Sequence, residues 1–271
     1  MGRPAPAGPL GGAVTVREPA VAGTFYPRNA AELSASVDAM LASAGAGEAG
    51  ELVALVVPHA GYVYSGPVAA SAYRLLRGST VRRVAVLGPA HFVPLRGCAT
   101  GAADAWATPL GQMPIDAELR ELAGDAGVEV ADGPHEPEHS IEVQLPFLQR
   151  LLLGDLTLLP IAVGPCPPTE VAGVIGALPV DVLVVVSTDL SHYHDDLTAK
   201  RFDRRTADAV LERDPDAIGP DDACGAFALR GLVEHARRRG LSVELLDLRT
   251  SADTAGDPRR VVGYGAFAFR A

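Results

Sequence analysis

The sequence predicts an α/β protein with one central, largely parallel or mixed β-sheet flanked by helices. Three aliphatic runs, at residues 52–57, 84–87 and 182–186, contain no charged residue, as is typical of strands buried on both faces. A predicted helix separates the first run from the second, and such strand–helix–strand units have right-handed crossovers. Each run ends in polar residues, which indicates a site at the carboxyl ends of the strands.

The other elements follow from periodicity and capping residues. Asn29, with Glu32 three residues later, is typical of a helix N-terminus. Pro67 is expected to open the next helix, which runs to residue 76, because proline suits the first helical turn. Residues 97–111 are expected to be irregular, and residues 132–153 to change from a polar loop into a helix. Further helices are expected over residues 33–41, 115–126, 169–178, 199–211 and 221–239, and further strands over residues 156–163, 242–248 and 261–269.

Residues 1–14 are rich in glycine, proline and alanine, and we expect a disordered tail there. Residues 15–271 contain no short repeat and no convincing linker, so we expect a single α/β domain.

Composition excludes several classes of function. The net charge of -10 and the pI of about 5.1 argue against binding to nucleic acid. No apolar stretch is long enough to span a bilayer, and no signal peptide is recognisable. The three cysteines are far apart and odd in number, so we expect no disulfide framework and a reducing, cytoplasmic setting.

A histidine follows each of three predicted strands. His59, His91 and His192 all lie beyond the last apolar residue of their runs. If these strands are parallel neighbours, the three imidazoles converge on one edge of the sheet. Imidazole is the commonest metal ligand near neutral pH, because it is largely uncharged there. For one histidine alone a structural role is the better interpretation, but the repeated position favours a functional site.

Two further residues suggest chemistry at this edge. Asp189 lies three residues before His192, and a carboxylate beside an imidazole orients the ring and raises its basicity. The alternative is that Asp189 caps the next helix. Cys224 is expected at a helix N-terminus, where a thiolate is stabilised and can bind iron, copper or zinc. The alternative is an inert buried thiol, which is also our interpretation of Cys98 and Cys166.

Three residues are candidates for binding a substrate. His139 and Glu142 are three residues apart and share a helix face if the helix has begun there. They would then line the pocket or bind substrate; equally, they could belong to a helix cap near Ser140. Tyr62 follows His59 closely and could line the same pocket, although loop tyrosines are common.

These motifs together resemble the Memo-like proteins, which in bacteria and archaea are often called AmmeMemoRadiSam system protein B. Each motif alone is weak, but the ordered set is specific and spans most of residues 16–269. The resembling segments are residues 20–26 (AVAGTFY), 58–62 (PHAGY), 87–91 (LGPAH), 138–147 (EHSIEVQLPF), 187–192 (STDLSH) and the Cys224-Gly225 helix start.

The resemblance implies a fold similar to that of the class III extradiol (LigB-type) dioxygenases, which hold non-haem Fe(II). It implies metal ligands at His59, His91 and Cys224, with Asp189 and His192 as the neighbouring acid and base. The dioxygenases use two histidines and a carboxylate, so Cys224 departs from their pattern and changes metal preference and redox potential. Animal members of the family are linked to cell motility, copper-dependent redox chemistry and iron handling.

Two functions are therefore carried forward. The first is a metal-dependent, dioxygenase-like oxidoreductase that binds Fe(II) or a Cu ion and acts on a small molecule or peptide, with His192, oriented by Asp189, moving a proton. The second is a non-catalytic module that recognises a ligand or peptide on the same fold. A weaker alternative is a hydrolase with Cys224 as nucleophile and His192 as base.

Overall fold

A computed structural model describes residues 14–47 and 50–271; most of the predicted N-terminal tail lies outside these ranges. The helices are α1 (Ala30–Ser43), α2 (Tyr62–Tyr73), α3 (Ala117–Asp125), α4 (Leu145–Leu151), α5 (Pro168–Ala177), α6 (Asp196–Glu212) and α7 (Ala226–Arg239). The strands are β1 (Val16–Arg17), β2 (Leu52–Val57), β3 (Arg83–Pro89), β4 (Cys98–Thr100), β5 (Ala105–Thr108), β6 (Gly111–Pro114), β7 (Glu129–Val130), β8 (Thr157–Val163), β9 (Val182–Ser187), β10 (His192–His194), β11 (Ser242–Thr250) and β12 (Val261–Arg270).

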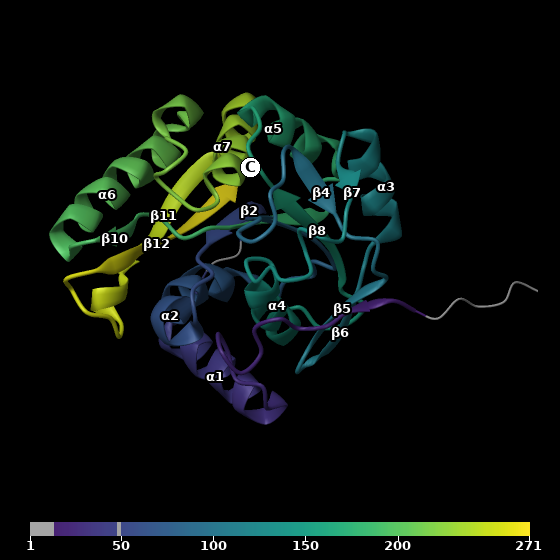
Figure 1. The fold of residues 1–271 in the computed structure, drawn as a ribbon, viewed down its shortest axis with the longest axis horizontal. Helices are drawn as coiled ribbons and strands as arrows, with labels where there is room; N and C mark the ends of the chain where they lie inside the picture. The colour runs from purple at the N-terminus through teal and green to yellow at the C-terminus, as the bar shows by residue number, and fades with distance from the viewer. Residues whose placement is uncertain (1–13, 48–49) are drawn as a thin grey trace, which may run out of the picture.

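One large mixed sheet forms the centre of the molecule, with helices on both faces (Figure 1). Its strand order is β10-β12-β2-β9-β3-β8-β4-β7, and β11 pairs with β12. The four central strands β2, β9, β3 and β8 are mutually parallel, whereas β12 and β4 flank them in the antiparallel direction. The predicted α/β class with a largely parallel or mixed sheet is confirmed. Strands β1, β5 and β6 form a separate small sheet.

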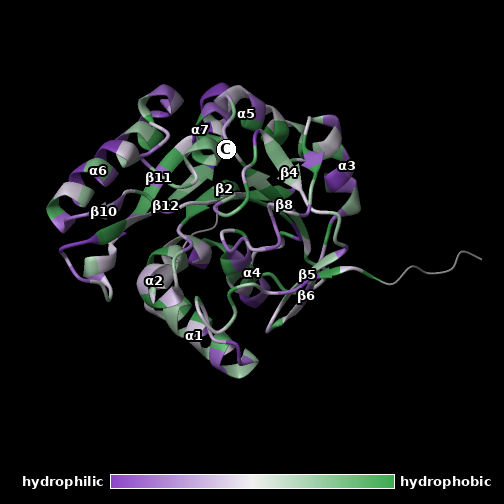
Figure 2. Cartoon of the chain, viewed as in Figure 1, coloured by the Kyte–Doolittle hydropathy of each residue, from purple (hydrophilic) through white to green (hydrophobic). Residues whose placement is uncertain are grey.

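The central strands divide their side chains between two cores. Ala54 and Val56 of β2 face the core under α3, α5, α6 and α7, while Leu55 and Val57 face the core under α1, α2 and α4. This alternation follows from the two-residue period of a strand, and it requires apolar residues at every position. Figure 2 shows the result as hydrophobic central strands and hydrophilic stretches on the outer helices.

Several boundaries differ from the predicted ones. Helix α2 begins at Tyr62, so Pro67 lies inside it rather than at its start. Tyr62, Ser65 and Gly66 are buried, and their packing favours a helix that begins before Pro67. Pro67 lacks a backbone N–H and therefore donates no hydrogen bond within this helix. Strands β4 and β5 lie in the segment expected to be irregular, because both pair with strands distant in sequence. Helix α7 begins at Ala226, five residues later than predicted.

None of the described helices is both long and apolar enough to cross a membrane.

Asp116 caps the start of α3 and links it by hydrogen bonds to strands β3 and β8. Its side chain accepts hydrogen bonds from the Leu119 N–H at 3.0 Å, from Arg83 Nε at 2.8 Å and from the Thr157 hydroxyl at 2.8 Å. Burial alone would raise the pKa of Asp116, but Arg83 and the other donors hold it at about 2, below its ordinary value of 3.8. The depressed pKa means that ionised Asp116 stabilises the fold.

We therefore expect Asp116→Asn, which keeps the capping oxygen but removes the charge, to lower the free energy of unfolding at pH 7 by about 2 kcal/mol. The stabilising contribution is present above the unfolded pKa near 3.8 and is lost as pH falls toward 2, so the difference between variant and wild type should shrink over that window. Urea unfolding at pH 7, 4 and 2.5 checks this. The exposed Asp125→Asn at the other end of α3 is the control, and an equal loss in both variants would contradict the assignment.

Candidate metal centre

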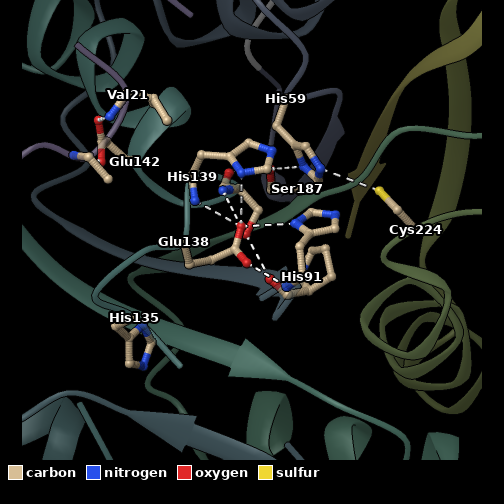
Figure 3. A network of polar contacts seen from close by, with 12 residues as sticks. Val21, His59, His91, His135, Glu138, His139, Glu142, Ser187 and Cys224 are labelled. Atoms are coloured by element: carbon tan, nitrogen blue, oxygen red, sulfur yellow. Dashed lines mark hydrogen bonds and ion pairs between the residues drawn. The ribbon is translucent and has the colours of Figure 1, made fainter. Parts of the chain in front are cut away.

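Three histidine side chains meet at the carboxyl edge of the parallel strands (Figure 3). His59 and His91 each lie two residues beyond their strands, β2 and β3, and His139 lies before the 3-10 turn η2 (Glu142–Gln144). The ring centroid of His59 lies 5.3 Å from that of His91 and 5.4 Å from that of His139, and the last two are 4.8 Å apart. One ring nitrogen of each residue lies within 4.8 Å of the others, so the three could bind one metal ion.

Glu138 organises two of these histidines. Its carboxylate accepts from His91 Nδ1 at 2.9 Å and from the backbone N–H groups of His91, His139 and Ser140 at 2.6–2.8 Å. Burial alone would raise the pKa of Glu138, but the hydrogen bonds and charge of His91 hold it at about 2. The carboxylate can only accept, so His91 Nδ1 carries a proton, and in the uncharged ring Nε2 then holds the lone pair. A carboxylate behind a histidine is the usual support of a metal ligand.

The Ser187 hydroxyl fixes the tautomer of His59. The Ser187 hydroxyl donates its single proton to the Ser140 carbonyl at 2.6 Å, so it must accept from His59 Nδ1 at 2.9 Å. Gln144 Nε2 also donates to this hydroxyl, at 2.8 Å. Nε2 of His59 is therefore unprotonated, and it lies 3.3 Å from the Cys224 sulfur.

Two of the three imidazoles, those of His59 and His139, are favoured in the uncharged form. Burial lowers the pKa of His59 well below 6.5, and the nearby His139 and His91 lower it further. Burial also lowers the pKa of His139 to about 4, and His91 adds to this against the opposing charge of Glu138. The Nδ1 atom of His139 is buried, has no hydrogen-bond partner among the described residues and lies 3.4 Å from the Glu138 carboxylate. Neutral rings with unshared lone pairs are the form that binds a metal.

Cys224 joins the cluster from the opposite side. The Asp189 N–H donates to its sulfur at 3.2 Å, and the His59 ring lies on the other side of that sulfur. Burial raises the pKa of the Cys224 thiol, and the carboxylate of Asp189 raises it further. Cys224 directly precedes Gly225, the N-cap of α7, but burial and Asp189 favour a neutral thiol over the expected thiolate.

Asp189 and His192 lie beside the cluster but are not hydrogen-bonded to each other among the described residues. Asp189 Oδ1 accepts from the His59 backbone N–H at 2.8 Å, and burial raises the pKa of this carboxyl to about 6. His192 Nδ1 donates to the Leu190 carbonyl at 2.8 Å, which leaves Nε2 available. His192 is displaced from the other histidines because it lies five residues past β9, at the start of β10.

Glu142 and Tyr62 lie apart from the histidines. The Glu142 carboxylate points toward Val21 (Figure 3), is fully buried and forms an ion pair with Arg17. It also accepts from the Tyr26 hydroxyl at 2.5 Å. The Tyr62 hydroxyl donates to the Val143 carbonyl at 2.7 Å within the apolar core. Both side chains have internal partners, whereas His139, the third predicted substrate-binding residue, is in the cluster.

Sequence reasoning missed Glu138 and Ser187, which support the histidines. Glu138 directly precedes His139, so its position beside a candidate ligand was a usable signal. Ser187 ends β9, and its pairing with His59 depends on β9 lying next to β2. Phe92 was also missed; it is 60% exposed and its ring lies 5.8 Å from that of His139, at the rim of the site.

Comparison with known proteins identifies the family of the chain. The profile of the family described as Memo-like protein matches residues 17–268. The chain belongs to the Memo-like family. It is 32% identical to a MEMO1 family protein of Nitrosopumilus maritimus, over 94% of this chain and 99% of the relative. MEMO1 family proteins of Methanococcoides burtonii and Aquifex aeolicus are each 35% identical, over 93% and 92% of this chain and 98% and 97% of theirs.

A solved structure shares the fold of this Memo-like protein. The crystal structure of the uncharacterized protein JW3007 from Escherichia coli K12 superposes with a TM-score of 0.51 and covers 80% of this chain and 99% of its own. The sequence identity is 13%, so the likeness concerns the fold alone.

We expect Glu142→Ala to lower the free energy of unfolding by about 3–5 kcal/mol, because it leaves the Arg17 guanidinium buried without its partner. Chemical denaturation measures this. Glu118→Ala, which removes a carboxylate that is 70% exposed in its ion pair with Arg83, is the control and should cost less than about 1 kcal/mol. Native stability of Glu142→Ala together with loss of ligand binding would instead support a substrate-binding role.

Proposed function

We propose that this Memo-like protein is a metal-dependent oxidoreductase that holds iron or copper at His59, His91 and His139, with Cys224 as an additional ligand. The observation that carries the proposal is the group of three ring nitrogens within 4.8 Å of one another. We infer that the substrate is a small molecule or a peptide.

The donor set fits such an ion. The hydrogen bonds of His59 and His91 to protein oxygens each use Nδ1, which leaves Nε2 for coordination; at His59 the metal would replace the contact of Nε2 with the Cys224 thiol. Imidazole suits iron and copper, and a thiolate favours Cu(I), zinc or iron. The neutral Cys224 thiol is compatible with this role, because coordination to a cation removes the proton from a thiol. A bound iron or copper ion would supply one-electron and oxygen chemistry that side chains lack.

The protein's own residues would control the position of protons around the site. Asp189 is buried, and its pKa of about 6 allows it to exchange a proton near neutral pH. Its hydrogen bond to the His59 backbone keeps it beside the metal ligands. We assign proton transfer with substrate to His192 Nε2, because Nδ1 is held by the Leu190 carbonyl. His192 is half-buried, so a substrate can reach it from solvent.

Access to the site is from the side of His91, whose side chain is 27% exposed. Phe92 stands exposed beside it, and Phe25 contacts His139 with ring centroids 4.6 Å apart. Two aromatic rings around a polar centre would exclude water from a bound substrate and present an apolar surface to it.

Metal content tests the proposal directly. The protein isolated without oxygen and without a metal-binding tag should contain close to one iron or copper ion, and His59→Ala and His91→Ala should contain almost none. His139→Ala and Cys224→Ala should bind less, and Cys224→Ala should lose the visible thiolate absorption of the oxidised site. His192→Ala should keep its metal, since we assign it a proton and not a bond to the ion. Elemental analysis and visible spectroscopy measure both properties.

Failure to bind iron or copper even after reconstitution would contradict the proposal. It would favour the alternative in which the pocket recognises a ligand without catalysis. Equal metal content in wild type and His91→Ala would place the ion elsewhere.

The support from Glu138 gives a finer test. Glu138→Gln should weaken metal binding by roughly 10- to 100-fold, because the amide cannot fix the His91 tautomer and ring as the carboxylate does. Metal competition with a chromophoric chelator measures the affinity. Glu136→Gln, an exposed residue on the same loop, makes the same charge change and should leave affinity unaltered. Similar affinities for both variants would show that Glu138 does not support the metal.

A further inference from the structure

A second group of potential ligands lies away from the histidines. Cys98 opens β4, Cys166 lies between β8 and α5, and Glu170 lies in the first turn of α5. The two sulfurs and a carboxylate oxygen of Glu170 all lie within 4.8 Å of one another. The cysteines are 68 positions apart in sequence, and only the folded chain brings them together.

The backbone holds these three residues in place. Strand β4 pairs antiparallel with β8, with Cys98 opposite Val163. Beyond this pair, the Gly164 N–H donates to the Gly97 carbonyl at 2.9 Å, and the Gly97 N–H donates to the Pro165 carbonyl at 3.3 Å. Gly97 has a positive φ of +73°, and a Cβ there would come within 2.9 Å of Glu170 Oε1. The absence of a side chain at Gly97 therefore leaves room for the carboxylate to approach the sulfurs.

The group runs from the core to the surface. Cys98 is 2% exposed, Cys166 is half-buried and Glu170 is exposed. Within residues 14–47 and 50–271, no lysine or arginine forms an ion pair with Glu170. The contact between the two thiols raises the pKa of Cys98 and lowers that of Cys166. Two adjacent thiols and a carboxylate without a lysine or arginine partner offer three potential ligand atoms to a cation.

We propose that Cys98, Cys166 and Glu170 form a second cation site, for a thiophilic divalent ion of the Zn²⁺ type. Zinc binds two thiolates and a carboxylate in tetrahedral geometry at roughly 2.0–2.3 Å, and small side-chain rotations close the observed group to that geometry. The fourth position is taken by water from the exposed side. Binding forms two metal–sulfur bonds and one metal–oxygen bond, and the two thiol protons pass to solvent; no redox change occurs.

The position of this site gives it a structural role. The ion would join strand β4, which lies between β8 and the edge strand β7, to the start of α5. The same region fixes the segment that follows His91, since Gly164 packs so closely on the Leu95 carbonyl that a Cβ would lie 2.1 Å from it. The inference does not depend on the proposed function, because it uses none of the residues of the histidine cluster.

The test uses Cys224→Ser as the parent protein, since Cys98 and Cys166 are then the only thiols in the chain. Reduced, metal-free protein is titrated with Cd²⁺ without oxygen, and the ultraviolet cadmium–thiolate absorption is followed. We expect one equivalent of Cd²⁺ to saturate the band with release of about two protons, as two thiols deprotonate. Zn²⁺ should compete for the same site and reduce the cadmium–thiolate band.

Variants in this background identify the ligands. A further Cys166→Ser should abolish the cadmium–thiolate band, and so should Cys98→Ser. Glu170→Gln should weaken Cd²⁺ binding while the band remains, because it removes an oxygen ligand but no sulfur. Glu129→Gln on the neighbouring strand β7 is the matched control. The half-buried Cys166 is the main test position, because its replacement disturbs the core less than that of Cys98.

The absence of a cadmium–thiolate band in the folded, reduced Cys224→Ser protein would overturn the second site. A band that survives in the Cys166→Ser background, or an equal loss of affinity in Glu170→Gln and Glu129→Gln, would overturn the ligand set. Loss of iron or copper from the histidine cluster affects neither readout, so the two proposals fail independently.

Discussion

The order of the parallel strands is the constraint on which the site depends. Strand β9 lies between β2 and β3, and all three run in the same direction, so their carboxyl ends meet at one edge. His59 and His91 leave this edge from the two outer strands, and Ser187 ends the strand between them. Central strands of this kind are buried on both faces, and their apolar residues leave polar groups only at the ends. The burial of the central strands therefore also places the polar side chains of the site together at one edge of the sheet.

Burial at this edge favours a hydrogen-bond partner for each polar atom, and the partners of His59 and His91 fix where the protons of these two rings lie. Glu138 can only accept hydrogen bonds, and the Ser187 hydroxyl has already donated its proton. Both partners force the neighbouring imidazoles to carry hydrogen on Nδ1. Two histidines thus present the same ring nitrogen toward a common point. The lowered pKa values of His59 and His139 keep those two rings uncharged over the physiological range.

The two candidate cation sites differ in kind. The histidine cluster offers three imidazole nitrogens, and the Glu138 carboxylate supports one of these rings, His91, through a hydrogen bond. The group at Cys98, Cys166 and Glu170 offers two sulfurs and an oxygen across two segments of chain, which suits a cross-link. Their separation into imidazole-rich and thiol-rich sets gives each a different preference among transition metals.

The sequence by itself determined the class of fold, the central strands and the positions of His59 and His91, because long aliphatic runs and the residues that end them are local features. It also indicated Asn29 as a helix cap, and the Asn29 side chain does accept from the Ala31 and Glu32 N–H groups. Only the tertiary structure decided which residues complete the site. The pairing of β9 with β2 brings Ser187 to the cluster, and a loop brings Glu138 and His139. Glu142 lies only three residues after His139, but its side chain points away from the cluster and pairs with Arg17. Contacts between residues far apart in sequence depend on the packing of whole elements, and no local pattern records them.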